Sequence, residues 1–167
     1  MLDLSQLNRQ LMVRDFVANT CVALNKNQWN DYLALCDSND FGYSIENYSP
    51  EITKRQCWMR QNFEGLKHVI DLLPKHNSDH AQLTRHITTY SVRETETSDV
   101  YEVNSQLAIY RTEWDSDNSH LKSGATTLYV IGSYLDQVAI TSSGIKLRRR
   151  TVELETRQVG TGSHFIL

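Results

Sequence analysis

The second half of the chain alternates apolar and polar residues over long stretches, and this pattern constrains the fold most. Between Tyr101 and Glu113, the apolar residues Val103, Leu107 and Ile109 fall in one phase. Such alternation places successive side chains on opposite faces of a β-strand. Similar stretches run over residues 86–92, 128–140 and 145–157. We therefore predict four long strands, joined by turns at residues 95–99, 115–124 and 141–144.

The first half instead predicts helices. Apolar residues recur at three- and four-residue steps and predict a helix from about Ser5 to Leu24, with a stripe made of Leu4, Leu7, Leu11, Val13, Val17, Cys21 and Leu24. Asn27 is expected to cap a second, short helix, and residues 41–46 form a short strand. A third helix is predicted over residues 51–73, and Pro74 is expected to stop it.

The last predicted strand changes phase within its length. Ile145 and Leu147 share one phase, whereas Val152 and Leu154 occupy the other. Such a switch predicts a bulge or sharp bend near Arg148 to Thr151, which curls a sheet. Helices followed by a curled sheet predict an α+β cone, formed by residues 1–167 as a single domain.

Composition excludes several classes of partner. A net charge of -3 gives no reason to expect nucleic acid or an anionic membrane. The N-terminus lacks the features of a signal peptide, and no apolar run approaches the roughly 20 residues that a membrane span needs. The three cysteines cannot form a closed disulfide set, so we expect buried thiols and a cytoplasmic location.

Motifs of catalysis and cofactor binding are absent from the sequence. It has no Gly-rich phosphate loop, no C-x-x-C and no G-x-S-x-G. His76, Asp79, His80 and His86 could in principle supply the ligands of a non-haem iron. Because His76 to His80 follow Pro74 in a polar connector, we favour surface histidines and expect no metal in this chain.

An acid–base site inside the cone is the alternative hypothesis. Asp31, Tyr43, His68 and His86 lie on elements that could point inward, and a buried Asp beside a Tyr or His would suit proton abstraction. No spacing singles out a dyad, so we favour a structural role for these residues and expect no catalytic residue.

The run Arg148-Arg149-Arg150 has two interpretations of equal weight. On a strand its members alternate, so they cannot all face the same way. The run can be a solvated edge that discourages aggregation. It can also present guanidinium groups to acidic residues of a partner subunit.

Residues 128–167 resemble the C-terminal end of the beta subunits of aromatic-ring-hydroxylating dioxygenases. In that family a Gly-x-Tyr strand and an Arg-rich strand lead to an R-x-V-x-L-[DE]-T-R segment and a Gly-rich tail. The matching residues here are Gly132, Tyr134, Arg150, Val152, Leu154, Glu155, Thr156 and Arg157, then Gly160, Gly162, Ser163 and His164. One turn departs from the family pattern, because Ser142-Ser143-Gly144 stands where Asp-Gly is usual.

The resemblance implies a nuclear-transport-factor-2-like (NTF2-like) cone and a non-catalytic subunit. It implies an alpha subunit as partner, with a Rieske iron-sulfur cluster and a mononuclear iron in that subunit and no cofactor in this chain. Three alpha and three beta subunits are expected to assemble. The early part of the chain is more similar to divergent relatives that act on sulfonates such as methanesulfonate.

The interface residues that we predict on this basis lie on the last strand and in the tail: Arg148, Arg149, Arg150, Arg157, His164 and Phe165. The tail ending in Phe165-Ile166-Leu167 is too apolar to stay in water, so we expect it to dock on its own sheet or on a neighbour. The alternative is a stand-alone isomerase or dehydratase of the same fold, in which Asp31, Tyr43 or His86 converge in a cavity.

Overall fold

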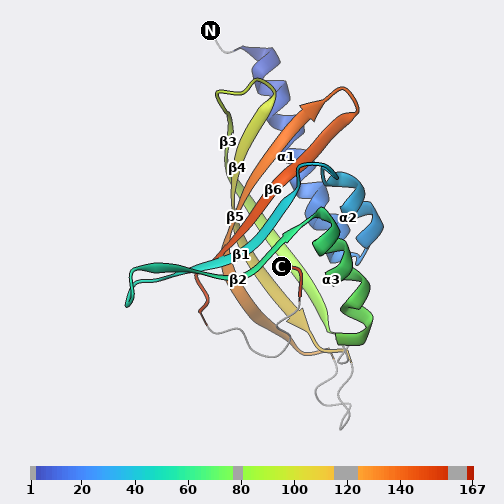
Figure 1. Ribbon diagram of the computed structural model, residues 1–167, viewed down its shortest axis with the longest axis vertical. Coiled ribbons are helices and arrows are strands. Elements are labelled where there is room, and N and C mark those ends of the chain that lie inside the picture. Colours follow the sequence, from blue (N-terminus) through green and yellow to red (C-terminus); the bar gives the residue numbers. More distant parts are fainter. Residues whose placement is uncertain (1–2, 77–80, 115–123, 158–164) are drawn as a thin grey trace.

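The computed structural model describes residues 3–76, 81–114, 124–157 and 165–167. Six strands form one mixed sheet in the order β2-β1-β6-β5-β4-β3. They are β1 (Gly42–Ser49), β2 (Lys54–Asn62), β3 (Gln82–Glu94), β4 (Val100–Thr112), β5 (Thr126–Thr141) and β6 (Gly144–Leu154). The helices α1 (Leu4–Asn25), α2 (Trp29–Leu35) and α3 (Phe63–His76) lie on one side of this curved sheet (Figure 1). The predicted α+β cone is confirmed.

The first helix is buried only in its second half. Asp3 caps α1 by accepting a hydrogen bond from the backbone N–H of Ser5 at 2.9 Å. Leu4 and Leu11 are exposed, whereas burial begins at Val13 and continues to Leu24. The predicted stripe is therefore wrong for its first three members, because the N-terminal turns of α1 extend past the end of the sheet (Figure 1).

The predicted cap of the second helix is also wrong. Gln28 precedes α2 and makes no capping bond with its side chain. Asn27 instead adopts a left-handed backbone with φ of 54°, and its side chain donates to Oε1 of Gln82 at 3.0 Å. The residue thus fixes the turn between α1 and α2 against β3.

Residues 51–73 differ most from the prediction. A single helix is predicted there, whereas the structure has the strand β2 followed by the helix α3. Lys54 to Asn62 pair antiparallel with β1 and form a hairpin, and α3 then runs through Pro74 to His76. β2 is an edge strand with mostly exposed side chains, so burial imposes little apolar alternation on its sequence. The hairpin projects away from the helices in Figure 1.

The predicted bulge in the last strand is confirmed. Along the β5–β6 ladder, Val138 pairs with Leu147 and Gln137 pairs with Arg149, so Arg148 is the additional residue. The bulge turns both Leu147 and Arg150 toward the helices, although they are three residues apart.

Gly132 makes the closest approach between these two strands. A Cβ atom at this position would lie 2.3 Å from the backbone oxygen of Glu153. Glycine is therefore required where β5 crosses the end of β6. β6 also pairs in parallel with β1, which makes the sheet mixed.

Candidate functional site

The interior of the cone contains an ion pair at its centre. Arg150 and Asp136 have fully buried side chains on neighbouring strands. Arg150 donates from Nε to Oδ1 of Asp136 at 2.8 Å and from Nη2 to Oδ2 at 2.7 Å. Nη2 also donates to the hydroxyl of Thr20 on α1 at 2.8 Å. The pair thus ties the sheet to the first helix.

The ring of Tyr134 completes the surroundings of Arg150. The guanidinium carbon lies 4.1 Å from the centre of that ring, within the range of a cation–π contact. Burial by itself would lower the pKa of Arg150, but the Asp136 carboxylate outweighs it, and the pKa is raised well above its usual value. Arg150 therefore stays charged, and its predicted contact with a partner is wrong because no part of it reaches the surface.

Three tyrosines near this pair are held in their neutral form. Burial raises the pKa of Tyr32 and Tyr134 well above the ordinary value and that of Tyr43 to about 12. Among the residues that the structure describes, the hydroxyls of Tyr32 and Tyr134 have no hydrogen-bond partner. These hydroxyls therefore keep their protons and carry no charge near neutral pH.

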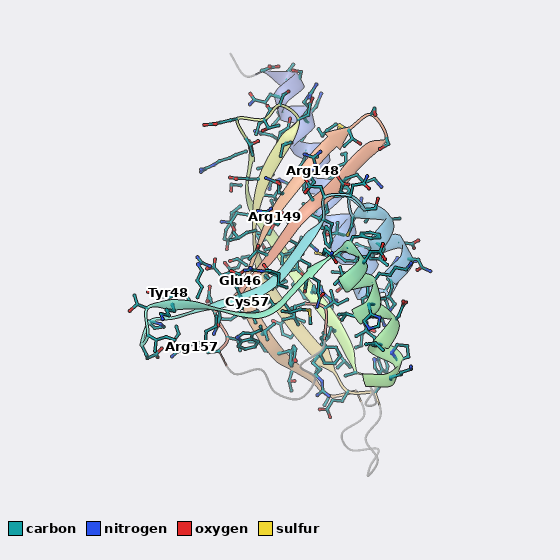
Figure 2. All side chains as sticks on the ribbon, in the orientation of Figure 1. Glu46, Tyr48, Cys57, Arg148, Arg149 and Arg157 are labelled. Atoms are coloured by element: carbon teal, nitrogen blue, oxygen red, sulfur yellow. The ribbon has the colours of Figure 1, made fainter. Side chains whose placement is uncertain are left out.

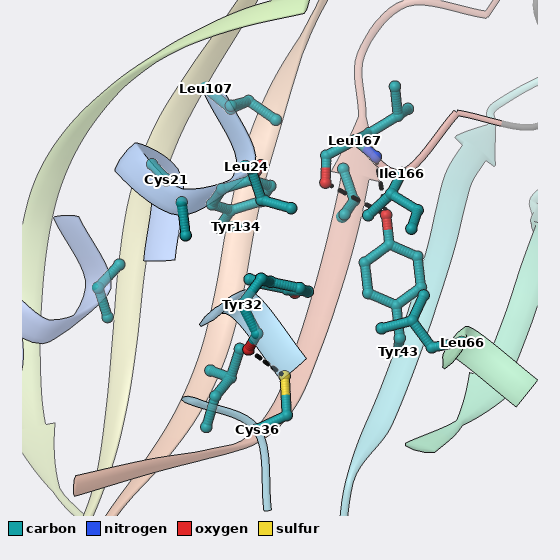
Figure 3. Close-up of a cluster of buried hydrophobic side chains, with 14 of the residues drawn as sticks. Cys21, Leu24, Tyr32, Cys36, Tyr43, Leu66, Leu107, Tyr134, Ile166 and Leu167 are labelled. Atoms are coloured by element: carbon teal, nitrogen blue, oxygen red, sulfur yellow. Dashed lines mark hydrogen bonds between the residues drawn. The ribbon is translucent and has the colours of Figure 1, made fainter. Parts of the chain in front are cut away.

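The C-terminal residues of the chain fill the space beside Tyr43 (Figure 3). The Tyr43 hydroxyl accepts from the backbone N–H of Leu167 at 2.9 Å and donates to its carbonyl oxygen at 3.2 Å. Phe165, Ile166 and Leu167 are all buried. The prediction that the tail docks on its own chain is confirmed for these residues, and Phe165 is therefore not an exposed interface residue. His164 lies outside the described residues.

The acid–base residues proposed from the sequence do not converge. Asp31 and His68 are exposed on helices, and His86 is exposed on β3 with its ring edge-on to Tyr110 at 5.3 Å. Only Tyr43 points into the interior, where it binds the tail. The prediction of a converging Asp31, Tyr43 and His86 site is thus wrong, because strand phase and helix face direct them to different surfaces.

The histidine hypothesis can be tested only in part. Asp79 and His80 lie outside the described residues, as does the side chain of His76. Among the residues that the structure does describe, no group of three His, Cys, Asp or Glu side chains is arranged to hold a metal ion. Within the same ranges, no helix has the length and apolar character required to cross a membrane.

The outer face of the sheet, defined here by Ser44, Glu46, Arg60, Asn104, Gln137, Arg149 and Thr151, contains two hollows. One measures about 430 Å³ and lies over β1, β2 and β6, and the other measures about 390 Å³ and lies over β3 to β6. Arg149 and Thr151 line both hollows. Arg149 is exposed there (Figure 2) and has no ion-pair partner among the described residues.

The other predicted interface arginines are already paired within the chain. Arg148 lies 3.4 Å from Asp37 and remains partly exposed. Arg157 binds the carboxylate of Glu51 at the tip of the β1–β2 hairpin, near Tyr48 (Figure 2). The pKa of Glu51 falls to about 2 because of its hydrogen bond with Arg157. These pairs hold the hairpin and the start of β1 against the rest of the chain.

Sequence reasoning missed Asp136, Thr20 and the hairpin. Asp136 shares its phase on β5 with Tyr134 and Val138, and Arg150 shares its phase with Val152. Opposite charges in the apolar phase of two neighbouring strands are a signal of a buried pair. That signal was available in the sequence once the bulge had been placed.

A curled mixed sheet with helices packed on one face is the arrangement of the NTF2-like class of cones. Solved structures agree at the level of the fold. A naphthalene 1,2-dioxygenase chain superimposes with a TM-score of 0.72 at 15% identity, over 96% of this chain and 84% of that one. The beta subunit of benzoate 1,2-dioxygenase from Burkholderia mallei gives 0.63 at 14% identity, over 99% of both chains.

Sequence comparison identifies the family. The chain is 33% identical to the beta subunit of methanesulfonate monooxygenase hydroxylase from Methylosulfonomonas methylovora, over 92% of this chain and 84% of the relative. It is 34% identical to the beta subunit of 2-aminobenzenesulfonate 2,3-dioxygenase from an Alcaligenes species, over 91% and 95%. No protein-family model matches the chain. The chain belongs to the family of beta subunits of multicomponent oxygenases.

Proposed function

We propose that this chain is the small, non-catalytic subunit of the hydroxylase component of a Rieske-type oxygenase. The observation that carries the proposal is the identity of 33% and 34% to two oxygenase beta subunits over more than nine tenths of the chain. The interior supports a structural role, because the Arg150–Asp136 pair is bound to Thr20 of α1 and Tyr43 binds the tail. The isomerase or dehydratase alternative is not favoured, since its proposed residues lie apart.

The reaction itself is assigned to an alpha subunit. In this proposal the Rieske cluster and the mononuclear iron are bound by that subunit, and three alpha and three beta subunits form the complex. Cys21 and Cys36 are buried as expected, whereas Cys57 on the edge strand β2 is exposed, so the expectation of a buried thiol is wrong there. Free thiols suit the reducing cytoplasm, where we place the complex.

The substrate of the complex is proposed to be an organic sulfonate. Both sequence relatives carry a sulfonate in their names, one a small alkyl sulfonate and the other an aromatic one. Oxygen consumption by the purified complex with methanesulfonate, an aromatic sulfonate and an unsulfonated arene would separate these classes.

The outer face of the sheet is the surface that we propose for subunit contact. The helices cover the opposite side, so this face keeps its side chains accessible (Figure 2). Arg149, which has no ion-pair partner in the described part of the chain, places its guanidinium between two hollows, and this suits a carboxylate on a partner.

Co-expression with the alpha subunit tests the proposal. The two chains should co-purify as a complex with the iron absorption of a Rieske protein, and light scattering should give the mass of three of each. Arg149→Glu should weaken this assembly, whereas Lys67→Glu, a matched charge reversal on the exposed side of α3, should not. A beta chain that purifies alone and leaves the alpha subunit fully assembled would refute the role.

A further inference from the structure

Arg85 is a second buried arginine of the interior, separate from the Arg150–Asp136 pair. It lies on β3 and is 5% exposed. Its Nη1 donates to Oδ1 of Asn25 at 3.3 Å and to the carbonyl oxygen of Leu83 at 3.4 Å, and its Nη2 donates to the carbonyl oxygen of Ile166. All three acceptors are neutral groups.

The charge of Arg85 is therefore not balanced by a neighbouring carboxylate side chain. No Asp or Glu among the described residues lies within ion-pair distance of it, and Nε has no hydrogen-bond partner. The buried charged residues of the described chain are Arg85, Arg150 and Asp136, and Arg150 occupies both oxygens of Asp136. Asp136 is therefore not available to Arg85, and no other carboxylate side chain is buried among the described residues.

A cavity of about 260 Å³ lies against Arg85. Its walls come from the start of α2, the end of α3, the start of β3 and the tail, and they are mainly apolar: Trp29, Ile70, Leu73, Pro74, Leu83 and Phe165. Among the described residues of the wall, Arg85 is the one cationic group, and Asn27 is a further polar residue. A largely apolar cavity with a few polar groups is typical of sites that bind small organic molecules. Arginine matches the oxygens of a carboxylate or sulfonate, and the Nε donor of Arg85 has no partner among the described residues.

We infer that this cavity binds a small organic anion, with its carboxylate or sulfonate group against Arg85 and its apolar part against Trp29 and Leu73. The site lies in the beta subunit itself and is distinct from the outer face proposed for subunit contact. The binding test uses this chain alone, so its result does not depend on the proposed role in subunit assembly.

Calorimetric titration of the full-length chain tests the inference. The probes are benzenesulfonate, benzoate and benzenesulfonamide, the last being a neutral molecule of nearly the same shape. Both anions should bind, and the sulfonamide should bind at least about tenfold more weakly, as expected for losing a charged hydrogen bond. Tighter binding of benzenesulfonate indicates a sulfonate site, and tighter binding of benzoate indicates a carboxylate site. No binding of either anion at millimolar concentration, or equal binding of all three probes, overturns the inference.

Variants assign the binding to the cavity. Arg85→Met should weaken benzenesulfonate binding by at least about tenfold. Arg93→Met, an exposed arginine of the same strand, should leave it unchanged. Should Arg85→Met fail to fold, Trp29→Ala removes one apolar wall at a partly exposed position, and it should weaken binding of benzenesulfonate while circular dichroism stays the same. Unchanged affinity in a folded variant of either residue overturns the site and leaves Arg85 a purely structural role.

Discussion

The two faces of the sheet differ in how their charged side chains are paired and exposed. On the inner face, Arg150 and Asp136 are excluded from water and satisfy each other at 2.7 and 2.8 Å. On the outer face and the hairpin, Arg148 and Arg157 pair with carboxylates that remain in contact with solvent, and Arg149 has no pair among the described residues. The arginines of both faces lie within residues 148–157, yet only Arg150 is part of the core. The bulge at Arg148 determines which arginine belongs to which face.

The largest effect is expected from breaking the buried pair. Arg150→Met leaves Asp136 buried without its cation, which should lower the free energy of unfolding by about 3–5 kcal/mol. The double variant Arg150→Met/Asp136→Leu removes both charges and should recover most of that loss. Urea unfolding of the purified chain measures both values.

A matched control for this prediction lies two residues earlier on the same strand. Arg148 is partly exposed beside Asp37, so Arg148→Met should cost no more than about 1 kcal/mol. If Arg148→Met and Arg150→Met lowered the free energy of unfolding equally, the buried pair would contribute no more to stability than the exposed one.

The docked tail provides the next test. Ile166 is 1% exposed, so Ile166→Ala should destabilise the fold by about 2–5 kcal/mol through lost burial and the cavity it leaves. Ile131 on the outer side of β5 is 37% exposed, and Ile131→Ala should cost clearly less. Thermal unfolding measures the stability of the two variants. If Ile166→Ala left the stability unchanged, the tail would contribute nothing to the core.

Hydroxyl deletions distinguish satisfied from unsatisfied groups within the interior. Tyr43→Phe removes both hydrogen bonds to Leu167 and should cost about 1–3 kcal/mol, because the tail's backbone groups lose their partner. Tyr134→Phe removes a hydroxyl that has no partner among the described residues and keeps the ring beneath Arg150, so its effect on stability should be neutral or favourable. Chemical denaturation of both variants provides the measurement, and the reverse order would contradict the hydrogen bonds described.

Alternation was sufficient to predict the long strands and the bulge, because burial on one face imposes a strict phase on the sequence. Alternation failed for β2, whose exposed edge position removes that constraint. Helical periodicity failed for the start of α1, where apolar residues lie beyond the sheet. The tail's docking followed from its apolar character. The role of Arg85 could not be predicted, since it depends on a partner from a distant segment, Asn25 on α1. The Arg150–Asp136 pair had a signal in the strand phases, but its further partner, Thr20 on α1, had none.

The smallest effect on stability is expected at the Arg157–Glu51 pair on the hairpin, because both side chains are about half exposed. The pKa of Glu51 is about 2 in the folded chain, against an ordinary value of 4.5, so its carboxylate favours the folded hairpin above about pH 4.5. That contribution is lost as the pH falls from about 4.5 through about 2. Arg157→Gln should return the pKa of Glu51 toward 4.5 in an NMR titration. In 1 M salt the difference in this pKa between the variant and the original chain should be smaller. Arg93→Gln, distant on β3, should leave it unchanged. An unaltered Glu51 pKa in the Arg157 variant would show that the pair does not hold the hairpin in solution, and Arg157 would then be as free as Arg149 to bind a partner subunit.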